Sequence, residues 1–245
     1  MEEITQEEAS RGWSIFTGMV SKAVEGAGGC AGSRALAARY LAKCDFDPDE
    51  AARKLVRRES LNCGLLGFTT GFGGLIALPV SIPADVLGSL MIQARMVGAV
   101  AHVYGHDAAN EETMTLIGLC MLGGQGANAV KDGLGRVGEQ MTVRAIKAIP
   151  REALTKINQA IGMRFVTKFG TTGVVNLGRA VPFVGSGVMG ALDYGLSRGV
   201  GKIALRLLAG AEEPDHELYY GENGERLHFF AAAGVDPDCL PEELN

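Results

Sequence analysis

The sequence lacks closely spaced cysteines. It contains five, and the nearest two, Cys30 and Cys44, are 14 positions apart. Zinc ribbons, dithiol redox centres and disulfide frameworks need paired cysteines at short or regular spacings, so this pattern argues against all three. We therefore expect reduced thiols in the core of a cytosolic protein. The first residues, MEEITQEEAS, also lack the basic start and apolar stretch of a secretory signal peptide.

An excess of basic charge is absent as well. The 245 residues include 23 Lys and Arg against 28 Asp and Glu, a formal net charge of −5. Nucleic-acid-binding domains carry a basic surface, so we expect no nucleic-acid partner. The charge is also unevenly distributed, because residues 211–245 contain ten acidic residues and one arginine. We interpret residues 1–210 as a helical domain and residues 211–245 as an acidic, loosely structured tail.

Strand signals are scarce, whereas apolar residues recur every three or four positions, as in amphipathic helices. Asp47 before Pro48, Asn110 before two glutamates, Pro83 and Pro150 are typical helix starts. The helix that Pro83 opens should end near Gly105, since glycine readily adopts the left-handed conformation after a helix. The sequence therefore predicts an all-α helical bundle with glycine-rich apolar helical hairpins.

The longest uncharged stretch runs over residues 60–84, which are 25 in number. A membrane-spanning helix needs roughly 20 apolar residues, so the length alone is sufficient. However, the stretch contains polar residues, five glycines and two prolines, which dilute its hydrophobicity and interrupt a helix near its end. We favour a buried helix, or a hairpin that enters one leaflet, over a single span.

Small residues at four-residue spacing occur in two apolar segments. They are Gly67 and Gly71 in the first, and Gly187, Ala191, Gly195 and Gly199 in the last. On a helix such residues form a flat ridge that allows a second helix to approach closely. We expect the two ridges to pack on each other, either in a soluble bundle or in a membrane.

Basic residues flank the same segments. Arg57 and Arg58 precede the uncharged stretch, and Arg198, Lys202 and Arg206 follow at successive i+4 positions on the last helix. Basic residues near an anionic lipid surface each contribute about 1 kcal/mol, so we predict that these five bind a membrane or a membrane protein. A solvated helix face is the alternative. The acidic tail would compete with lipid for the same cations.

Catalytic and cofactor motifs are weak. Asp85, Arg95 and His102 lie on one apolar helix and are the best candidates for a hydrolase cleft, although Asp85 could instead cap its own helix. No nucleophile elbow of the GxSxG type is present. Residues 185–190 match GxGxxG, but Pro182 interrupts the strand that a dinucleotide site requires. No third metal ligand accompanies His102 and His106. We therefore expect neither a cofactor nor a metal.

Two segments resemble a known family. Residues 78–107, LPVSIPADVLGSLMIQARMVGAVAHVYGHD, resemble the central signature of the EcsC family, and residues 180–208, AVPFVGSGVMGALDYGLSRGVGKIALRLL, resemble its closing segment. The resemblance extends over roughly residues 10–210. It implies a bacterial, mostly helical protein of unassigned biochemical activity, in a family named for a member encoded beside an ABC exporter. Asp193 departs from the pattern, where we expect asparagine.

Together these features favour a non-enzymatic, all-α, EcsC-like protein that associates peripherally with the inner face of the bacterial cell membrane. Its expected partner is an anionic membrane surface or a membrane protein such as a transporter. A hydrolase that uses Asp85, Arg95 and His102 is one alternative. A soluble helical scaffold is the other.

Overall fold

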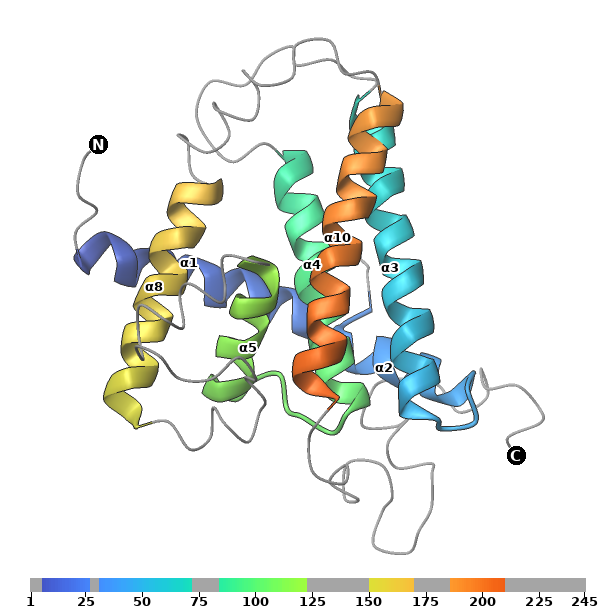
Figure 1. Ribbon diagram of the computed structural model, residues 1–245, viewed down its shortest axis with the longest axis horizontal. Coiled ribbons are helices and arrows are strands. Elements are labelled where there is room, and N and C mark those ends of the chain that lie inside the picture. Colours follow the sequence, from blue (N-terminus) through green and yellow to red (C-terminus); the bar gives the residue numbers. More distant parts are fainter. Residues whose placement is uncertain (1–5, 27–30, 72–83, 123–149, 170–185, 210–245) are drawn as a thin grey trace, which may run out of the picture.

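The computed structural model describes residues 6–26, 31–71, 84–122, 150–169 and 186–209, and within these ranges it contains α-helices and no strand (Figure 1). The helices are α1 (Gln6–Glu25), α2 (Ser33–Ala42), α3 (Pro48–Gly71), α4 (Ala84–Val103), α5 (Glu111–Leu122), α8 (Arg151–Phe169) and α10 (Ser186–Leu208). The all-α prediction is confirmed for this part of the chain. The proposed boundary at residue 210 and the acidic tail lie outside the described residues.

The predicted helix ends are confirmed. The Asp47 carboxylate accepts hydrogen bonds from the backbone N–H groups of Asp49 and Glu50 at 2.9 and 3.0 Å, so it caps the N-terminus of α3. The helix α4 ends at Val103, and Gly105 has a φ of 77° in the turn that follows. Only glycine adopts this conformation without steric cost, which explains the stop.

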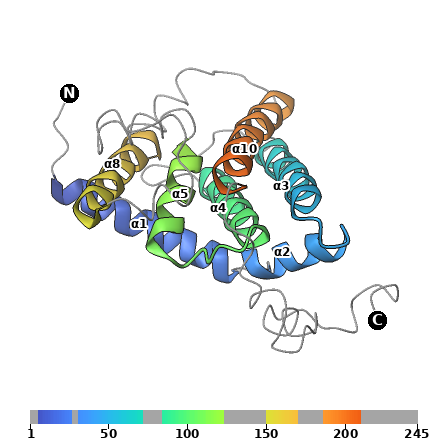
Figure 2. The ribbon, with the colours of Figure 1, turned by 60° about the horizontal axis from the view of Figure 1, so that its bottom comes forward.

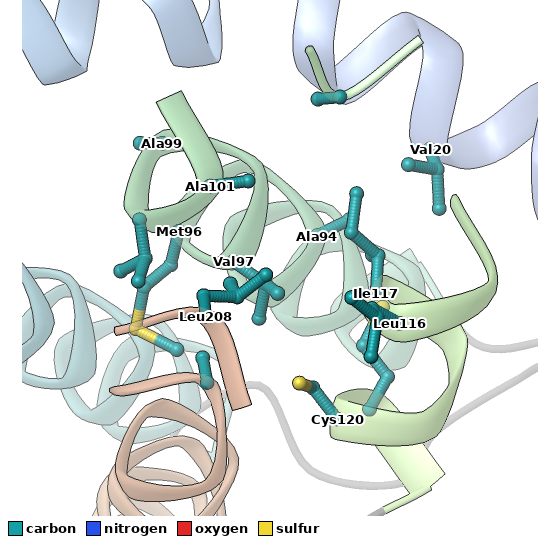
Figure 3. Packing of buried hydrophobic residues seen from close by; sticks show 14 of the residues in the cluster. Val20, Ala94, Met96, Val97, Ala99, Ala101, Leu116, Ile117, Cys120 and Leu208 are labelled. Carbon is teal, nitrogen blue, oxygen red and sulfur yellow. The ribbon is translucent and has the colours of Figure 1, made fainter. Parts of the chain in front are cut away.

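The central helix is α4, which packs against α1, α2, α3, α5 and α10. In Figures 1 and 2, α3 and α10 lie side by side at one edge of the bundle, and α1 and α8 lie together at the other. Figure 3 shows the core around α4, where Met96 and Val97 face Leu208 of α10 and the α5 residues Ile117 and Cys120. Close-packed apolar contacts of this kind supply most of a bundle's stability.

At the α1–α8 edge, two helices cross at a glycine. A Cβ placed on Gly162 would collide with backbone atoms of Ala9 and Trp13, so the absence of a side chain there allows the close approach. Phe16 of α1 contacts Phe165 of α8 edge-on, with ring centroids 5.4 Å apart. The arrangement makes α1 and α8 a tightly packed pair.

The uncharged stretch of residues 60–84 contributes the second half of α3 and the first residue of α4. Residues 72–83, between these helices, lie outside the described residues. Within the described ranges, every helix is either too short or too polar to cross a bilayer.

Candidate functional site

The antiparallel contact between α3 and α10 is set by small residues. A Cβ on Gly64 would lie 3.0 Å from the carbonyl oxygen of Gly190, and a Cβ on Gly190 would lie 2.8 Å from that of Gly64. Further along the pair, Gly201 packs directly against Val56. These contacts fix the register. Residues 56–68 of α3 lie alongside residues 190–201 of α10, and the two helices run in opposite directions.

Basic side chains gather on the outside of one half of this pair. The exposed residues are Arg53, Lys54, Arg57 and Arg58 on α3, with Lys202 and Arg206 on α10; Arg198 of α10 is half-buried. We call these seven residues the basic surface. Among the described residues, only Lys54 of this set forms an ion pair, with Glu50 at 2.8 Å. Because Val56 lies against Gly201, the cations of both helices share one level along the pair.

Large apolar side chains are exposed on the other half of the pair. They are Leu61, Leu65 and Phe68 on α3, and Leu192 and Leu196 on α10. Leu65 and Leu196 are 59% and 60% exposed. We call these five residues the apolar patch. In the described residues, the other large apolar side chain with comparable exposure is Ile15 of α1. The patch is thus confined to α3 and α10.

The prediction that Gly187, Ala191, Gly195 and Gly199 form the packing ridge of α10 is wrong for the described residues. All four are exposed, and a Cβ on any of the three glycines meets no described atom within 4 Å. The packed glycines are instead Gly190 and Gly201 on α10, and Gly64 on α3.

The rotation of α10 explains this outcome. Gly190 and Gly201 share a helix face with Ala204 and Leu208, which are fully buried. Turning the glycine ridge inward would instead bury Lys202 and Arg206, which lie on the same side of the helix as Gly195 and Gly199 and are exposed in the structure. On α3, Gly67 is buried, and the surroundings of Gly71 lie outside the described residues.

Inside the bundle, α3 and α4 are joined by a buried ion pair. Arg95 Nη2 lies 2.5 Å from Glu59 Oε2, and Asn62 Nδ2 donates to Glu59 Oε1 at 2.9 Å. Glu59 is only 3% exposed. Arg95, a weak catalytic candidate by sequence, thus pairs with Glu59, a residue for which the sequence indicated no role. Glu59 is the last charged residue before the uncharged stretch.

The three catalytic candidates do not converge. Asp85, Arg95 and His102 lie on the single continuous helix α4. A helix rises 1.5 Å per residue, so about 25 Å of helix separates Asp85 from His102. The charged groups that influence the pKa of His102 are Arg34, Asp107 and His106, and the partner of Arg95 is Glu59. Asp85 lies in the first turn of α4, and its side chain is outside the described residues.

Burial keeps one histidine and two thiols of the core neutral at pH 7. Burial, assisted by Arg34, lowers the pKa of His102 to about 4. Burial raises the pKa of the Cys63 thiol to about 11 and that of Cys120 to about 12. Cys44, Cys63 and Cys120 are buried and free, as the cysteine spacing predicted for these three. In the described ranges, no group of three or more His, Cys, Asp or Glu side chains could hold a metal ion.

A family comparison adds to this picture, because the model of the EcsC protein family matches residues 18–208. The chain belongs to the EcsC protein family. The match begins within α1 and ends at the last residue of α10, so it includes both halves of the α3–α10 pair and excludes residues 211–245. No curated protein and no solved structure matches the chain.

Proposed function

We propose that this EcsC-family protein is a non-enzymatic, peripheral membrane-binding protein that attaches to anionic lipid at the inner face of the cell membrane. The basic surface supports the proposal, because two antiparallel helices present their cations there at one level. Among the described residues, Glu50 is the one acidic residue that pairs with any of these cations. The principal contacts are assigned to Arg57, Arg58, Arg198, Lys202 and Arg206.

The energetics of such a surface are favourable. Each Lys or Arg near an anionic leaflet contributes about 1 kcal/mol, and several aligned cations act together. The attraction decays within a Debye length, about 10 Å at 0.1 M salt, so binding should depend strongly on salt. The net charge of −5 does not prevent this, because the acids are concentrated in residues 211–245.

The polar residues of α4 support a non-enzymatic role. Arg95 is paired with Glu59, and His102 is buried seven residues further along the same helix. The hydrolase alternative required these residues and Asp85 to act on one bond, which their spacing of about 25 Å along α4 opposes. A membrane protein with an acidic surface could pair with the same cations. The vesicle experiment below distinguishes this partner from lipid.

The test is cosedimentation of the full chain with vesicles of phosphatidylcholine, alone or mixed equally with phosphatidylglycerol. We expect binding to the anionic vesicles only, and its loss as salt rises. Replacing Arg57, Arg58, Lys202 and Arg206 with glutamine should abolish binding, since these four are exposed and form no ion pair with any described residue.

A matched control removes four exposed cations from other helices, namely Arg11, Arg39, Arg151 and Lys156. It changes the net charge equally and should preserve binding. Equal losses in both variants would show a nonspecific charge effect. If the unmodified chain ignores pure lipid vesicles, direct lipid binding is wrong and a protein partner takes its place.

A further inference from the structure

We infer that the apolar patch of α3 and α10 enters the hydrocarbon edge of the bilayer while the basic surface stays among the headgroups. The inference rests on the proposed function, which concerns the cations alone. It assigns a second, apolar component to binding and an orientation to the bound protein, with the Gly71 end of α3 and the Ser186 end of α10 directed into the membrane.

The apolar patch is unusually exposed. Five of the six most exposed large apolar side chains of the described residues lie on these two helices. A scattered exposed leucine is ordinary on a soluble protein, whereas a contiguous group marks an interaction surface. Leu61, Leu65 and Phe68 recur at helical spacing along one face of α3, and Leu192 and Leu196 recur likewise on α10.

On both helices, exposed cations give way to exposed apolar side chains at a shared level. On α3 the change falls between Arg58 and Leu61, and on α10 it falls between Leu196 and Arg198. The contacts of Gly64 with Gly190 and of Gly201 with Val56 place these two boundaries beside each other. Segments more than a hundred residues apart in the chain therefore form one surface with one boundary.

The length of the apolar patch matches the depth of the membrane interface. Leu61 and Phe68 are seven residues apart, which is about 10 Å along a helix. Helices that bind at the membrane interface bury their apolar face about 5–10 Å into the headgroup and acyl boundary. In Figure 1 the patch-bearing ends of α3 and α10 reach higher than those of the other helices, so this end can approach a flat surface.

Charge complementarity selects lipid as the occupant. An anionic leaflet presents negative headgroups directly above hydrocarbon, in the same order as the basic surface and the apolar patch. A second copy of this chain, paired patch to patch by a two-fold axis, would cover the apolar side chains but would bring no anionic partner to the basic surface. A bilayer with anionic headgroups satisfies both halves of the surface at once.

The experiment uses tryptophan as a depth probe in the full chain. We compare Leu65→Trp in the patch with Ile15→Trp, an equally exposed apolar site on α1, where α1 lies at the opposite edge of the bundle. The native Trp13 is common to both proteins and supplies the background. Vesicles contain equal amounts of phosphatidylglycerol and phosphatidylcholine, with or without bromine on the acyl chains.

We expect the emission of Leu65→Trp to shift to the blue and to be quenched by brominated acyl chains, and the emission of Ile15→Trp to stay unchanged. In parallel, the variant Leu65→Asn/Leu196→Asn should bind these vesicles at least about tenfold more weakly, since each leucine loses the free energy of burial. Ile15→Asn is its control and should bind normally. Unchanged thermal melting of each variant establishes that it is folded.

The outcomes separate the two proposals. Salt-sensitive vesicle binding with no quenching of Leu65→Trp would overturn insertion and leave the electrostatic proposal standing. Failure of the unmodified chain to bind vesicles would overturn both. A concentration-dependent blue shift of Leu65→Trp without lipid, accompanied by dimers in sedimentation, would show that a second copy covers the patch and would also overturn insertion.

Discussion

Gly64 of α3 and Gly190 of α10 lie so close that the carbonyl oxygen of each occupies the space that a Cβ on the other would need. The contact joins two helices that are more than a hundred residues apart in the chain. It also sets which residues of α3 face which residues of α10. The alignment of the basic surface and of the apolar patch follows from this one crossing.

Replacing Gly190 with alanine should therefore destabilise the protein by about 1–3 kcal/mol, because the new methyl group lies 2.8 Å from a backbone oxygen. The control is Gly199→Ala on the same helix, where the methyl group meets open space. That change should be neutral or slightly stabilising, since alanine is the better helix former. Urea denaturation measures both, and equal midpoints would contradict the observed register.

The crossing of α1 and α8 should be at least as sensitive. A Cβ on Gly162 would collide with the carbonyl oxygen of Ala9 and with the amide nitrogen of Trp13. Backbone atoms cannot rotate away as a flexible side chain can, so Gly162→Ala should separate the helices and lower the melting temperature. The exposed Gly18 of α1 is the matched site, and Gly18→Ala should leave melting unchanged. A similar effect at both positions would argue against this crossing.

Breaking the buried ion pair should be costly. Glu59→Ala leaves the Arg95 guanidinium without its carboxylate in a mostly buried position, and we expect a loss of about 3 kcal/mol in the free energy of unfolding. Replacing both residues with methionine should recover most of that loss, because neither charge is then buried. Glu50→Ala, which breaks the exposed pair with Lys54, is the control and should have little effect. Chemical denaturation distinguishes the three variants.

Stability should fall in mild acid because of His102. Burial holds its pKa at about 4 in the folded protein, whereas an unfolded chain has the ordinary value of about 6.5. As the pH falls below 6.5 the unfolded state takes up the proton first, so stability is lost between pH 6.5 and pH 4. The total loss from this group is about 3 kcal/mol.

The groups around His102 determine the control. The charge of Arg34 opposes its protonation and that of Asp107 favours it, whereas the backbone hydrogen bond of His106 favours protonation and the charge of His106 opposes it. The variant His102→Gln should lose less stability than the unmodified protein over this pH range, whereas His106→Gln should retain most of the pH dependence. Denaturation midpoints at several pH values give the comparison. Parallel pH profiles for the unmodified protein and His102→Gln would show that another group is responsible.

The acidic residues 211–245 should oppose membrane binding. Their ten acidic side chains are tethered to the last helix and compete with lipid for its cations. A chain truncated after Gly210 should bind anionic vesicles more tightly at low salt, and the difference should shrink at about 1 M salt, where the Debye length is about 3 Å. Equal vesicle binding by the two proteins at low salt would leave the tail as a solubilising segment.

Local features of the fold could be predicted from the sequence. The start of α3 at Pro48 and the end of α4 before Gly105 depend on interactions within a few residues. The Asp47 carboxylate reaches only its own helix, and the conformation of Gly105 is a property of glycine itself. Family membership was visible for a similar reason, since residues 78–107 and 180–208 are continuous motifs.

The partners of these elements could not be predicted in the same way. Both faces of α10 carry small residues, so the pattern alone did not decide whether Gly190 or Gly195 would be buried. Likewise the sequence placed Arg95 on an apolar helix without indicating that Glu59 would neutralise it. These choices depend on the total apolar area buried by all helices together.

Sequence patterns alone thus predict that this protein is helical, where several helices begin and end, and which segments are apolar or basic. That Leu65 and Leu196 share one exposed patch, and Arg57 and Lys202 one basic surface, follows only from the packing of α3 against α10. The difference lies in the range of the interactions. Caps and helix periodicity act over one or two turns, whereas the rotation and register of α3 against α10 arise from close packing between distant segments.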